Sequence, residues 1–475
     1  MPSITDALLA FLTILLFYLV HIYRLVQKKY DSKYPPCAPG TMWTNLKNIA
    51  SSEYFWRMIE IASTTPHRVF QISLPLNVTS HFIVVGDPDI ARTILTDRTT
   101  IKPSKLYDSF CKVSGGLTIF TSSVGDDEWH KRRKAAAPAF SSRHVRRMTR
   151  VALEKTQEWL TNNIDEGQTF DVSKEMLQII LTALTETAFD YQMSKDQCDV
   201  LGHDLHLALV EYTRKSPANP FRKFRYSHLV LPERRKAMKA AQSVRDLIFD
   251  IMEAYKLKET KEEGTIIQLV MESPKAFPTD DDKIAQLTEF LLVGHETTAF
   301  TIAWVLLVIS QHAEEQEKLY EDLKRTKEET GEESWSSSCE YLKLVIKEAM
   351  RLYPVGRSLR TTKRDFQTPA GLIPKNSVCS FQFLLLFRNP NIFPQPNTFQ
   401  PTRWIEATKE MDDALFPFSL GKRNCMGQSL GNAEVYAVVA RICYEFELEV
   451  VDNGKPDVGL VMKAEGAMLR VKKRR

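Results

Sequence analysis

The chain has 475 residues, of which 43% are hydrophobic and 26% are charged, with 18 glycines. This is the composition of a globular protein, and it excludes a disordered, collagen-like or polytopic membrane protein. Lysine and arginine (63) barely exceed aspartate and glutamate (59), so the net charge of +4 does not indicate a nucleic-acid partner. The length permits one large domain or two or three smaller ones.

Residues 4–23 predict a transmembrane anchor. Within residues 7–20 only Thr13 is polar, and the whole apolar stretch approaches the roughly 20 residues that a spanning helix needs. Basic residues stand only after it, at positions 24, 28 and 29, which places the following domain in the cytosol by the positive-inside rule. A cleaved signal peptide or a buried helix is the alternative.

A basic and proline-rich linker is predicted at residues 24–40, because the prolines at positions 35, 36 and 39 prohibit helix. Beyond it we find no repeat and no second proline-rich boundary. Residues 41–475 are therefore predicted to form one large domain.

The predicted elements are mainly helices with a small β part. Residues 69–74 and 81–85 favour short strands. The longest predicted helix starts after Thr279, a residue suited to cap it, and runs to about residue 309. It is apolar nearly all round, so it is expected to cross the middle of the protein.

At the centre of this helix, Gly294 and Glu296 each break a local rule, since glycine weakens a helix and a carboxylate is costly in an apolar one. Such violations indicate a functional site. The alternative is a glycine for close packing and a glutamate on a solvated face.

Seven cysteines, an odd number, are scattered without a CxxC pair, which indicates a reduced compartment and one cysteine with a special role. Around Cys425 the chain reads FSLGKRNCMG over residues 418–427. Gly421 and Gly427 let the backbone turn around the sulfur, and Arg423 favours the thiolate. The pattern predicts a thiolate directed at a metal.

This run fits FxxGxRxCxG and resembles the haem-ligand signature of the cytochrome P450 monooxygenases. Four further motifs of that family occur in the right order. They are the WxxxR of Trp129–Arg133, the oxygen-activation motif of Gly294–Thr297, the ExxR of Glu348–Arg351 and the FxPxRW of Phe399–Trp404. The resemblance covers the chain from the anchor to its end, and it implies a single large helical domain of this type behind the transmembrane helix.

The resemblance implies haem b with the Cys425 thiolate as axial ligand of the iron. It places Phe418 and Gly421 in the ligand loop, and it assigns the haem propionates to Trp129, Arg133, Arg360 and Arg423. For Arg360 a surface arginine is the alternative. Glu348, Arg351 and Arg403 are expected to form a structural triad that holds the cysteine loop.

Glu296 and Thr297 are the predicted catalytic pair, with Thr297 holding an ordered water and Glu296 linking it to solvent protons. Gly294 is expected to leave room for oxygen beside an opened helix.

The sequences GHETTA and GDDEWHKRRKAAAPAFS most resemble the branch of the family that hydroxylates the ends of fatty acids. Many of that branch tether haem through a glutamate where this chain has Gln286, so no such ester is expected, although Glu289 lies near. The expected substrate is an amphiphilic acid with an alkyl or isoprenoid tail, and the specific expectation is a prenylated amino acid, as in algal kainoid pathways. Its carboxylate is assigned to Lys102, Lys105, Lys112 or Arg357, although solvent exposure explains the lysines equally well.

Two basic regions predict partners. Residues 214–239 hold nine Lys or Arg with interleaved aromatics, which suits an anionic membrane surface, with a solvated loop as the alternative. Within residues 131–150 a second cluster is formed by Lys131, Arg132, Lys134, Arg143, Arg146, Arg147 and Arg150, and in the resembling family that face receives an NADPH-cytochrome reductase. Cytochrome b5 is a further expected partner. The endoplasmic reticulum membrane is the expected location, with a plastid membrane as the alternative.

The sequence therefore predicts a monooxygenase that hydroxylates an unactivated C–H bond, expected at a terminal methyl, and that carries the methyl to an acid by successive turns. Two other functions remain open: an oxygen-independent haem isomerase or dehydratase, and a non-enzymatic haem-binding protein.

Overall fold

The computed structural model describes residues 13, 16–17, 31–41, 44–45, 54–73, 81–122, 127–216, 222, 226–459 and 461–474. The predicted anchor at residues 4–23 lies outside these apart from three positions, and the linker at 24–40 is described only from residue 31. Both stay predictions. The chain separates into two compact units, one made of residues 1–101 and 358–386, the other of residues 102–357 and 387–475.

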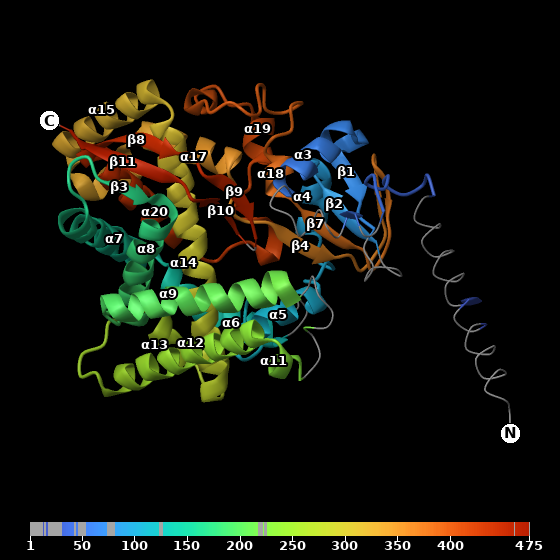
Figure 1. The fold of residues 1–475 in the computed structure, drawn as a ribbon, viewed down its shortest axis with the longest axis horizontal. Helices are drawn as coiled ribbons and strands as arrows, with labels where there is room; N and C mark the ends of the chain where they lie inside the picture. The colour runs from blue at the N-terminus through green and yellow to red at the C-terminus, as the bar shows by residue number, and fades with distance from the viewer. Residues whose placement is uncertain are drawn as a thin grey trace. The chain divides into compact units, whose positions relative to one another are not determined.

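The first unit is built on a four-stranded sheet in the order β1-β2-β7-β4 (Figure 1). β1 and β2 pair antiparallel with Phe70 opposite Val84, β2 runs parallel to β7, and β4 pairs antiparallel with β7. The predicted strands at 69–74 and 81–85 are confirmed in shorter form. The elements of this unit are α3 (Tyr54–Thr64), η1 (Pro66–Arg68), β1 (Val69–Gln71), β2 (Phe82–Val85), α4 (Pro88–Thr96), β4 (Ser358–Thr361), β5 (Phe366–Thr368), β6 (Gly371–Ile373), β7 (Val378–Phe381) and α18 (Phe383–Leu386).

The second unit is mainly helical. Its elements up to the long central helix are α5 (Ser104–Ser114), α6 (Asp127–Ala136), η2 (Ala137–Phe140), α7 (Ser142–Asn163), β3 (Thr169–Asp171), α8 (Val172–Phe189), α9 (Lys195–Leu209), η3 (Val210–Lys215), α11 (Ser227–Val230), α12 (Pro232–Leu257), α13 (Ile266–Met271) and α14 (Asp280–Ser310). After it come α15 (Ala313–Thr330), η5 (Glu332–Ser334), α16 (Trp335–Ser338), α17 (Glu340–Leu352), η6 (Pro401–Trp404), α19 (Lys409–Ala414), η7 (Gly421–Arg423), α20 (Gln428–Glu445), β8 (Phe446–Asp452), β9 (Lys455–Val458), β10 (Met462–Glu465) and β11 (Met468–Lys473).

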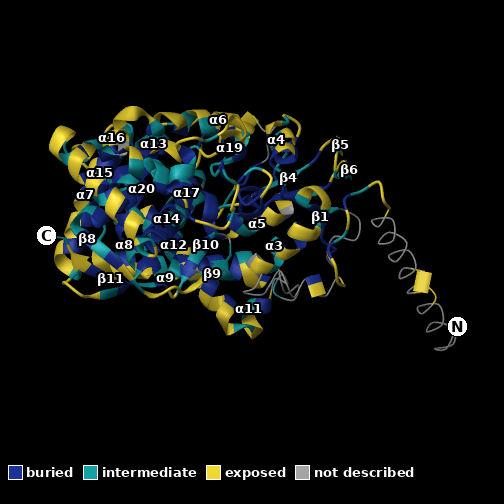
Figure 2. Cartoon of the chain, turned by 90° about the horizontal axis from the view of Figure 1, so that it is seen from above, coloured by how far each residue is buried: buried dark blue, intermediate teal, exposed yellow. Residues whose placement is uncertain are grey.

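α14 is the centre of this unit, as the sequence predicts. A capping box starts it: the Asp282 N–H donates to Thr279 Oγ1 at 3.1 Å, and the Thr279 N–H donates to the Asp282 carboxylate at 3.3 Å. α8, α12 and α20 pack against it, and Figure 2 shows its buried course within outer helices that carry the exposed residues. Among the described residues it is the one helix long and apolar enough to cross a membrane, but it is mostly buried, so it is a core helix.

Small sheets complete the second unit. β11 lies between β3 and β8 in an antiparallel three-stranded sheet, and β9 and β10 form a two-stranded ribbon. The Trp304 indole N–H of α14 donates to the Met462 carbonyl at 3.0 Å, which fixes β10 across the central helix.

Candidate active site

The loop before α20 presents Cys425. Gly421 has φ +74, a left-handed conformation that glycine adopts without the cost a side chain imposes. This turn brings the chain back on itself, so the Cys425 N–H donates to the Phe418 carbonyl at 2.9 Å. At Gly427 a side chain would stand 3.9 Å from the Cys425 sulfur. Gly421 thus turns the loop that carries the thiol, whereas a side chain at Gly427 would make only an ordinary contact with the sulfur.

Cys425 differs from the other cysteines in its surroundings. Four of the others are buried, whereas the Cys425 side chain is solvent-accessible. It is nevertheless enclosed by protein, and this burial raises the pKa of its thiol, while the N–H groups of Gly427 and Gln428 and the charge of Arg133 act in the opposite direction. Of the described cysteines, Cys425 is the one whose side chain is exposed.

One face of α14 also borders open space. Val293, Thr297 and Thr301 are partly accessible, although most residues around them on this helix are buried. Their spacing of four residues puts them on one helix face. A partly accessible stripe on a buried helix is what a helix shows when it lines a binding cavity.

α14 and α20 cross close to this stripe. A side chain at Gly431 would lie 3.6 Å from Thr298 Oγ1, so the helices approach closely there. Cys425 precedes Gly431 by six residues, and Thr297 is the neighbour of Thr298. The crossing therefore brings the two ends of the predicted site, the thiol and the α14 stripe, into one region.

Glu296 and Thr297 lie at the centre of the helix. Burial raises the pKa of Glu296 to about 7, and the positive charge of Lys463 in β10 opposes this shift. The Thr297 hydroxyl donates to the Val293 carbonyl at 2.8 Å. The pair thus combines a carboxyl poised to exchange protons near neutral pH with a hydroxyl on the accessible stripe.

The expected opening of the helix at Gly294 is not found. α14 is α-helical from residue 280 to 310, and a side chain at Gly294 would come within 3.0 Å of Leu184 in α8. Close packing between the two helices, which the sequence left as the alternative for this glycine, accounts for its presence.

Trp129 and two arginines form a cationic cluster beside the loop. Arg133 donates to the Asn424 carbonyl at 3.2 Å and to its side-chain oxygen at 2.9 Å. The Arg423 guanidinium lies 4.1 Å from the Trp129 ring and donates to the Ile119 carbonyl at 2.8 Å. Trp129 donates to the same carbonyl at 3.2 Å. Three of the four predicted propionate contacts are therefore in one cluster.

Arg360, the fourth, belongs to the first unit. It is 2% exposed and donates to the Ser358 hydroxyl and to the Leu359 carbonyl, each at 2.8 Å. It is therefore not a surface arginine, and its role toward haem stays a prediction.

Sequence reasoning missed a polar network behind the cationic cluster. The N–H groups of Ile119 and Phe120 donate to Gln286 at 3.0 Å and to Glu289 at 2.8 Å. Lys102 is buried and donates to the Phe120 carbonyl at 2.6 Å. Burial raises the pKa of Glu289 to about 8. Because these partners are as many as 169 residues apart, no local pattern indicates them.

A second buried carboxyl, Glu434 of α20, was also missed. Burial raises its pKa to about 8, and a hydrogen bond from Thr298 opposes the shift. Glu434 is 2% exposed, so it lies on the inner side of the α14–α20 crossing.

Other predicted residues take different places. Arg132, assigned to the basic docking face, is buried and pairs with Asp282 at 2.7 Å, because it holds the first turn of α14. Lys112 and Arg357 are exposed, and the side chain of Lys105 lies outside the described part. The position of Lys102 in the buried network accounts for it without a substrate contact.

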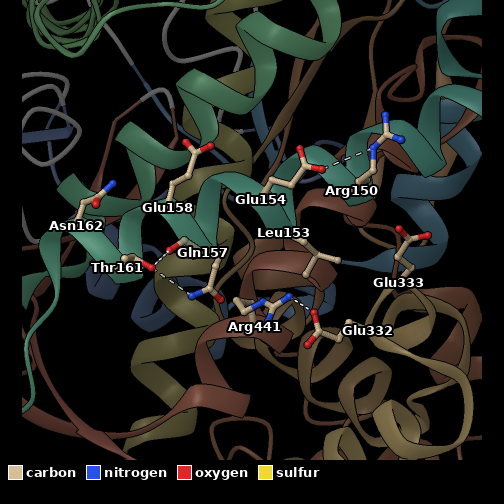
Figure 3. A pocket seen from close by; sticks show the side chains of 10 residues that line it. All are labelled: Arg150, Leu153, Glu154, Gln157, Glu158, Thr161, Asn162, Glu332, Glu333 and Arg441. Atoms are coloured by element: carbon tan, nitrogen blue, oxygen red, sulfur yellow. Dashed lines mark hydrogen bonds and ion pairs between the residues drawn. The ribbon is translucent and has the colours of Figure 1, made fainter.

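An open polar depression of about 570 Å³ lies on α7, η5 and α20 (Figure 3). It is lined by Arg150, Leu153, Glu154, Gln157, Glu158, Thr161, Asn162, Glu332, Glu333 and Arg441. None of the predicted site residues lines it, and its lining is spanned by ion pairs such as Arg441–Glu332. It does not supply the oxidation site.

The comparisons with known proteins agree with this geometry. The family model described as Cytochrome P450 matches residues 35–471. Probable cytochrome P450 4e1 of Drosophila melanogaster is 27% identical over 395 residues, covering 77% of this chain and 73% of that protein. Cytochrome P450 4F2 of Homo sapiens is 26% identical over 427 residues, covering 81% and 79%.

A third relative, the cyclooctat-9-en-7-ol 5-monooxygenase of Streptomyces melanosporofaciens, is 24% identical over 437 residues, covering 88% of this chain and 92% of that protein. Among solved structures, a mutant heme domain of cytochrome P450DA superposes with a TM-score of 0.81 at 21% identity, over 93% of this chain and 98% of that one. The chain belongs to the cytochrome P450 family. It has the fold of that family, and it is a monooxygenase that binds haem through a cysteine thiolate.

The described residues fit that cofactor. No three His, Cys, Asp or Glu side chains among them converge as a metal-ion site, whereas one thiol, that of Cys425, is exposed beside the cationic cluster. A single thiolate with a nearby cationic cluster suits a metal carried by an anionic prosthetic group.

Proposed function

We propose that this monooxygenase hydroxylates the terminal methyl group of an amphiphilic acid with an alkyl or isoprenoid tail. Each turn takes one O2 and two electrons from NADPH, puts one oxygen atom into the C–H bond and releases the other as water. Repeated turns carry the methyl to an acid. The GHETTA sequence of α14 supports the terminal position, since it resembles the fatty-acid end-hydroxylating branch.

Cys425 is the proposed iron ligand, in a loop held by Phe418 and Gly421. Trp129, Arg133, Arg423 and Arg360 are the proposed partners of the propionates, and the cluster geometry of the first three supports this. Bound haem with a thiolate ligand supplies the oxidising chemistry. The protein positions it and controls protons and water.

Proton delivery is assigned to Thr297 and Glu296. Glu296, with its pKa of about 7, exchanges protons at neutral pH. The positive charge that acts on this carboxyl is that of Lys463 in β10. The accessible stripe of Val293, Thr297 and Thr301 carries the proposal, because it puts the Thr297 hydroxyl on a partly accessible face of an otherwise buried helix. This hydroxyl also favours oxygen activation over an isomerase or dehydratase.

The proposed location is the endoplasmic reticulum membrane, with the anchor at residues 4–23. Tyr226, Leu229 and Val230, at and beside α11, are 63–66% exposed, which supports contact of this segment with lipid. NADPH-cytochrome reductase is the proposed electron donor, with cytochrome b5 as a further partner. Lys134 and Arg146 are the exposed members of the basic docking region without an ion pair among the described residues.

The test is reconstitution with NADPH-cytochrome reductase and dodecanoic acid, with product mass and hydroxyl position as readouts. Terminal hydroxylation is expected. Thr297→Ala should divert electrons to hydrogen peroxide and lower product per NADPH about tenfold or more, with substrate affinity little changed.

Thr301→Ala is the matched control. Thr301 makes the same bond one turn later, its hydroxyl donating to the Thr297 carbonyl at 2.7 Å, and it lies on the same stripe. Equal product per NADPH in the two variants would contradict the role of Thr297, and an in-chain hydroxyl would contradict the terminal position.

A further inference from the structure

Arg234 is a buried cation that has no ion-pair partner in the part of the chain that the structure describes. It stands in the first turn of α12 and is 7% exposed. Its Nε and Nη1 atoms are buried and donate no hydrogen bond to any described residue, and among the described residues no carboxylate forms an ion pair with it. Its neighbours Glu233 and Arg235 are exposed, so the burial is specific to this side chain.

Two acidic residues close to Arg234 in the chain or in η3, Glu211 and Glu233, are already engaged. Glu211 of η3 accepts from Arg222 and from the Ser216 hydroxyl. Glu233 pairs with Lys215 at 2.7 Å and with Arg222 at 3.3 Å. The charge of Arg234 is therefore left over after the local ion pairs are made.

Leaving a guanidinium buried and unpaired is costly, because the desolvation of the charge is not repaid by an anion. A fold that only needed to fill this position would do so with an apolar side chain at lower cost. The arrangement is what a site for an external anion looks like before the anion binds.

The position of Arg234 suits a substrate head group. α12 packs against α9, α5 and α14, and α5 in turn packs against η3 and α14, so these elements cover the central helix together (Figure 1). η3 is a π-helix, a form that is frequent at functional sites. Its Tyr212 is buried, and the positive charge of Arg234 acts on the pKa of this phenol against the effect of burial.

We infer that Arg234 anchors the carboxylate of the substrate between η3 and the first turn of α12, while the tail extends toward the accessible stripe of α14. Guanidinium and carboxylate are planar groups that pair with two hydrogen bonds, which gives orientation as well as affinity. This inference rests on the proposed function, because it takes the substrate to be an amphiphilic acid. It is an alternative to Lys102, Lys105, Lys112 and Arg357, which the sequence suggests as carboxylate contacts.

The test is spectral titration of the haem-loaded enzyme with dodecanoic acid and with 1-dodecanol, which has the same chain and no charge. Wild type should bind the acid more tightly than the alcohol. Arg234→Met should weaken binding of the acid roughly 10- to 100-fold and change binding of the alcohol less than about twofold. Arg235→Met, one residue along on the exposed face, is the control and should change neither.

Stability separates a ligand site from a structural role. Ligand-free Arg234→Met should melt at or above the temperature of wild type, since it removes an unpaired buried charge, whereas loss of a structural contact would lower it. If the methionine variant does not fold, Arg234→Gln gives the same pair of titrations. Equal weakening of both ligands, unchanged affinity for the acid, or no preference for the acid in wild type would each overturn the inference.

Product analysis keeps this inference distinct from the proposed function. Terminal hydroxylation of the acid with no effect of Arg234→Met would overturn the anchor alone. An Arg234-dependent preference for the acid together with in-chain hydroxylation would support the anchor and overturn the terminal position.

Discussion

Glu348→Gln tests how the ligand loop is supported. The Glu348 carboxylate is 0% exposed and accepts five hydrogen bonds. The donors are Arg351 Nε at 2.9 Å, Arg351 Nη2 at 2.8 Å, Arg403 Nε at 2.8 Å, the Gln400 N–H at 3.1 Å and Trp404 Nε1 at 2.9 Å. The charge of one carboxylate thus balances two buried guanidinium groups.

The magnitude follows from this count. A glutamine has one acceptor oxygen, and its NH2 group is a donor. This NH2 group would face two N–H groups whose hydrogen bonds the second carboxylate oxygen now accepts, and both hydrogen bonds would be lost. Breaking a buried ion pair by removing one partner costs about 3–5 kcal/mol, because an uncompensated charge stays buried. Against a total stability of about 5–15 kcal/mol, this is a large fraction.

The assay is urea unfolding of the haem-loaded protein, with the haem absorption band as a second readout. Glu340→Gln is the control, since Glu340 stands on the same helix and pairs with Lys343 at the same spacing, but Glu340 is exposed and Lys343 is partly exposed. It should cost less than about 0.5 kcal/mol. A loss below about 1 kcal/mol for Glu348→Gln, or equal losses for the two variants, would refute the reasoning.

Two further predictions concern buried groups. Cys425→Ser should remove the red-shifted carbon monoxide band of the reduced protein. Cys443→Ser, which changes a buried thiol of α20, is the control and should keep the band. An unaltered band in Cys425→Ser would refute the ligand assignment. Glu434, whose pKa is raised to about 8, binds its proton more tightly in the folded chain than in the unfolded one, so wild type should lose stability as the pH rises from about 4.5 to 8. Between pH 5.5 and 7.5, Glu434→Gln should reduce the loss in the free energy of unfolding by up to about 2.7 kcal/mol, measured by urea unfolding. An unchanged pH dependence would contradict the raised pKa of Glu434.

Features that depend on short stretches of chain were predictable. The capping box at Thr279, the course of α14 and the helical pairing of Glu348 with Arg351 follow from residues three or four apart. The loop around Cys425 was equally predictable, because its glycines, arginine and cysteine lie within ten residues.

Features that depend on distant residues were not predictable. Arg132 stands in a basic run that indicates a surface, yet it pairs with Asp282, 150 residues away. Gly294 suggested space for oxygen, yet the structure fills that side with Leu184. In both cases the partner comes from another helix, and only packing decides which side chains meet.

By itself, the sequence determined the family, the thiolate chemistry and the central helix, because each rests on local spacing and residue type. The resemblance also predicted the triad of Glu348 with Arg351 and Arg403, which the structure contains. Only the tertiary structure decided the other buried charges: the fold pairs Arg132 with Asp282 and Glu211 with Arg222, and among the described residues it leaves Arg234 without an ion pair. Charge balance inside a protein is a property of the packed neighbourhood, since burial sets the cost of each charge and distant segments supply its counterion.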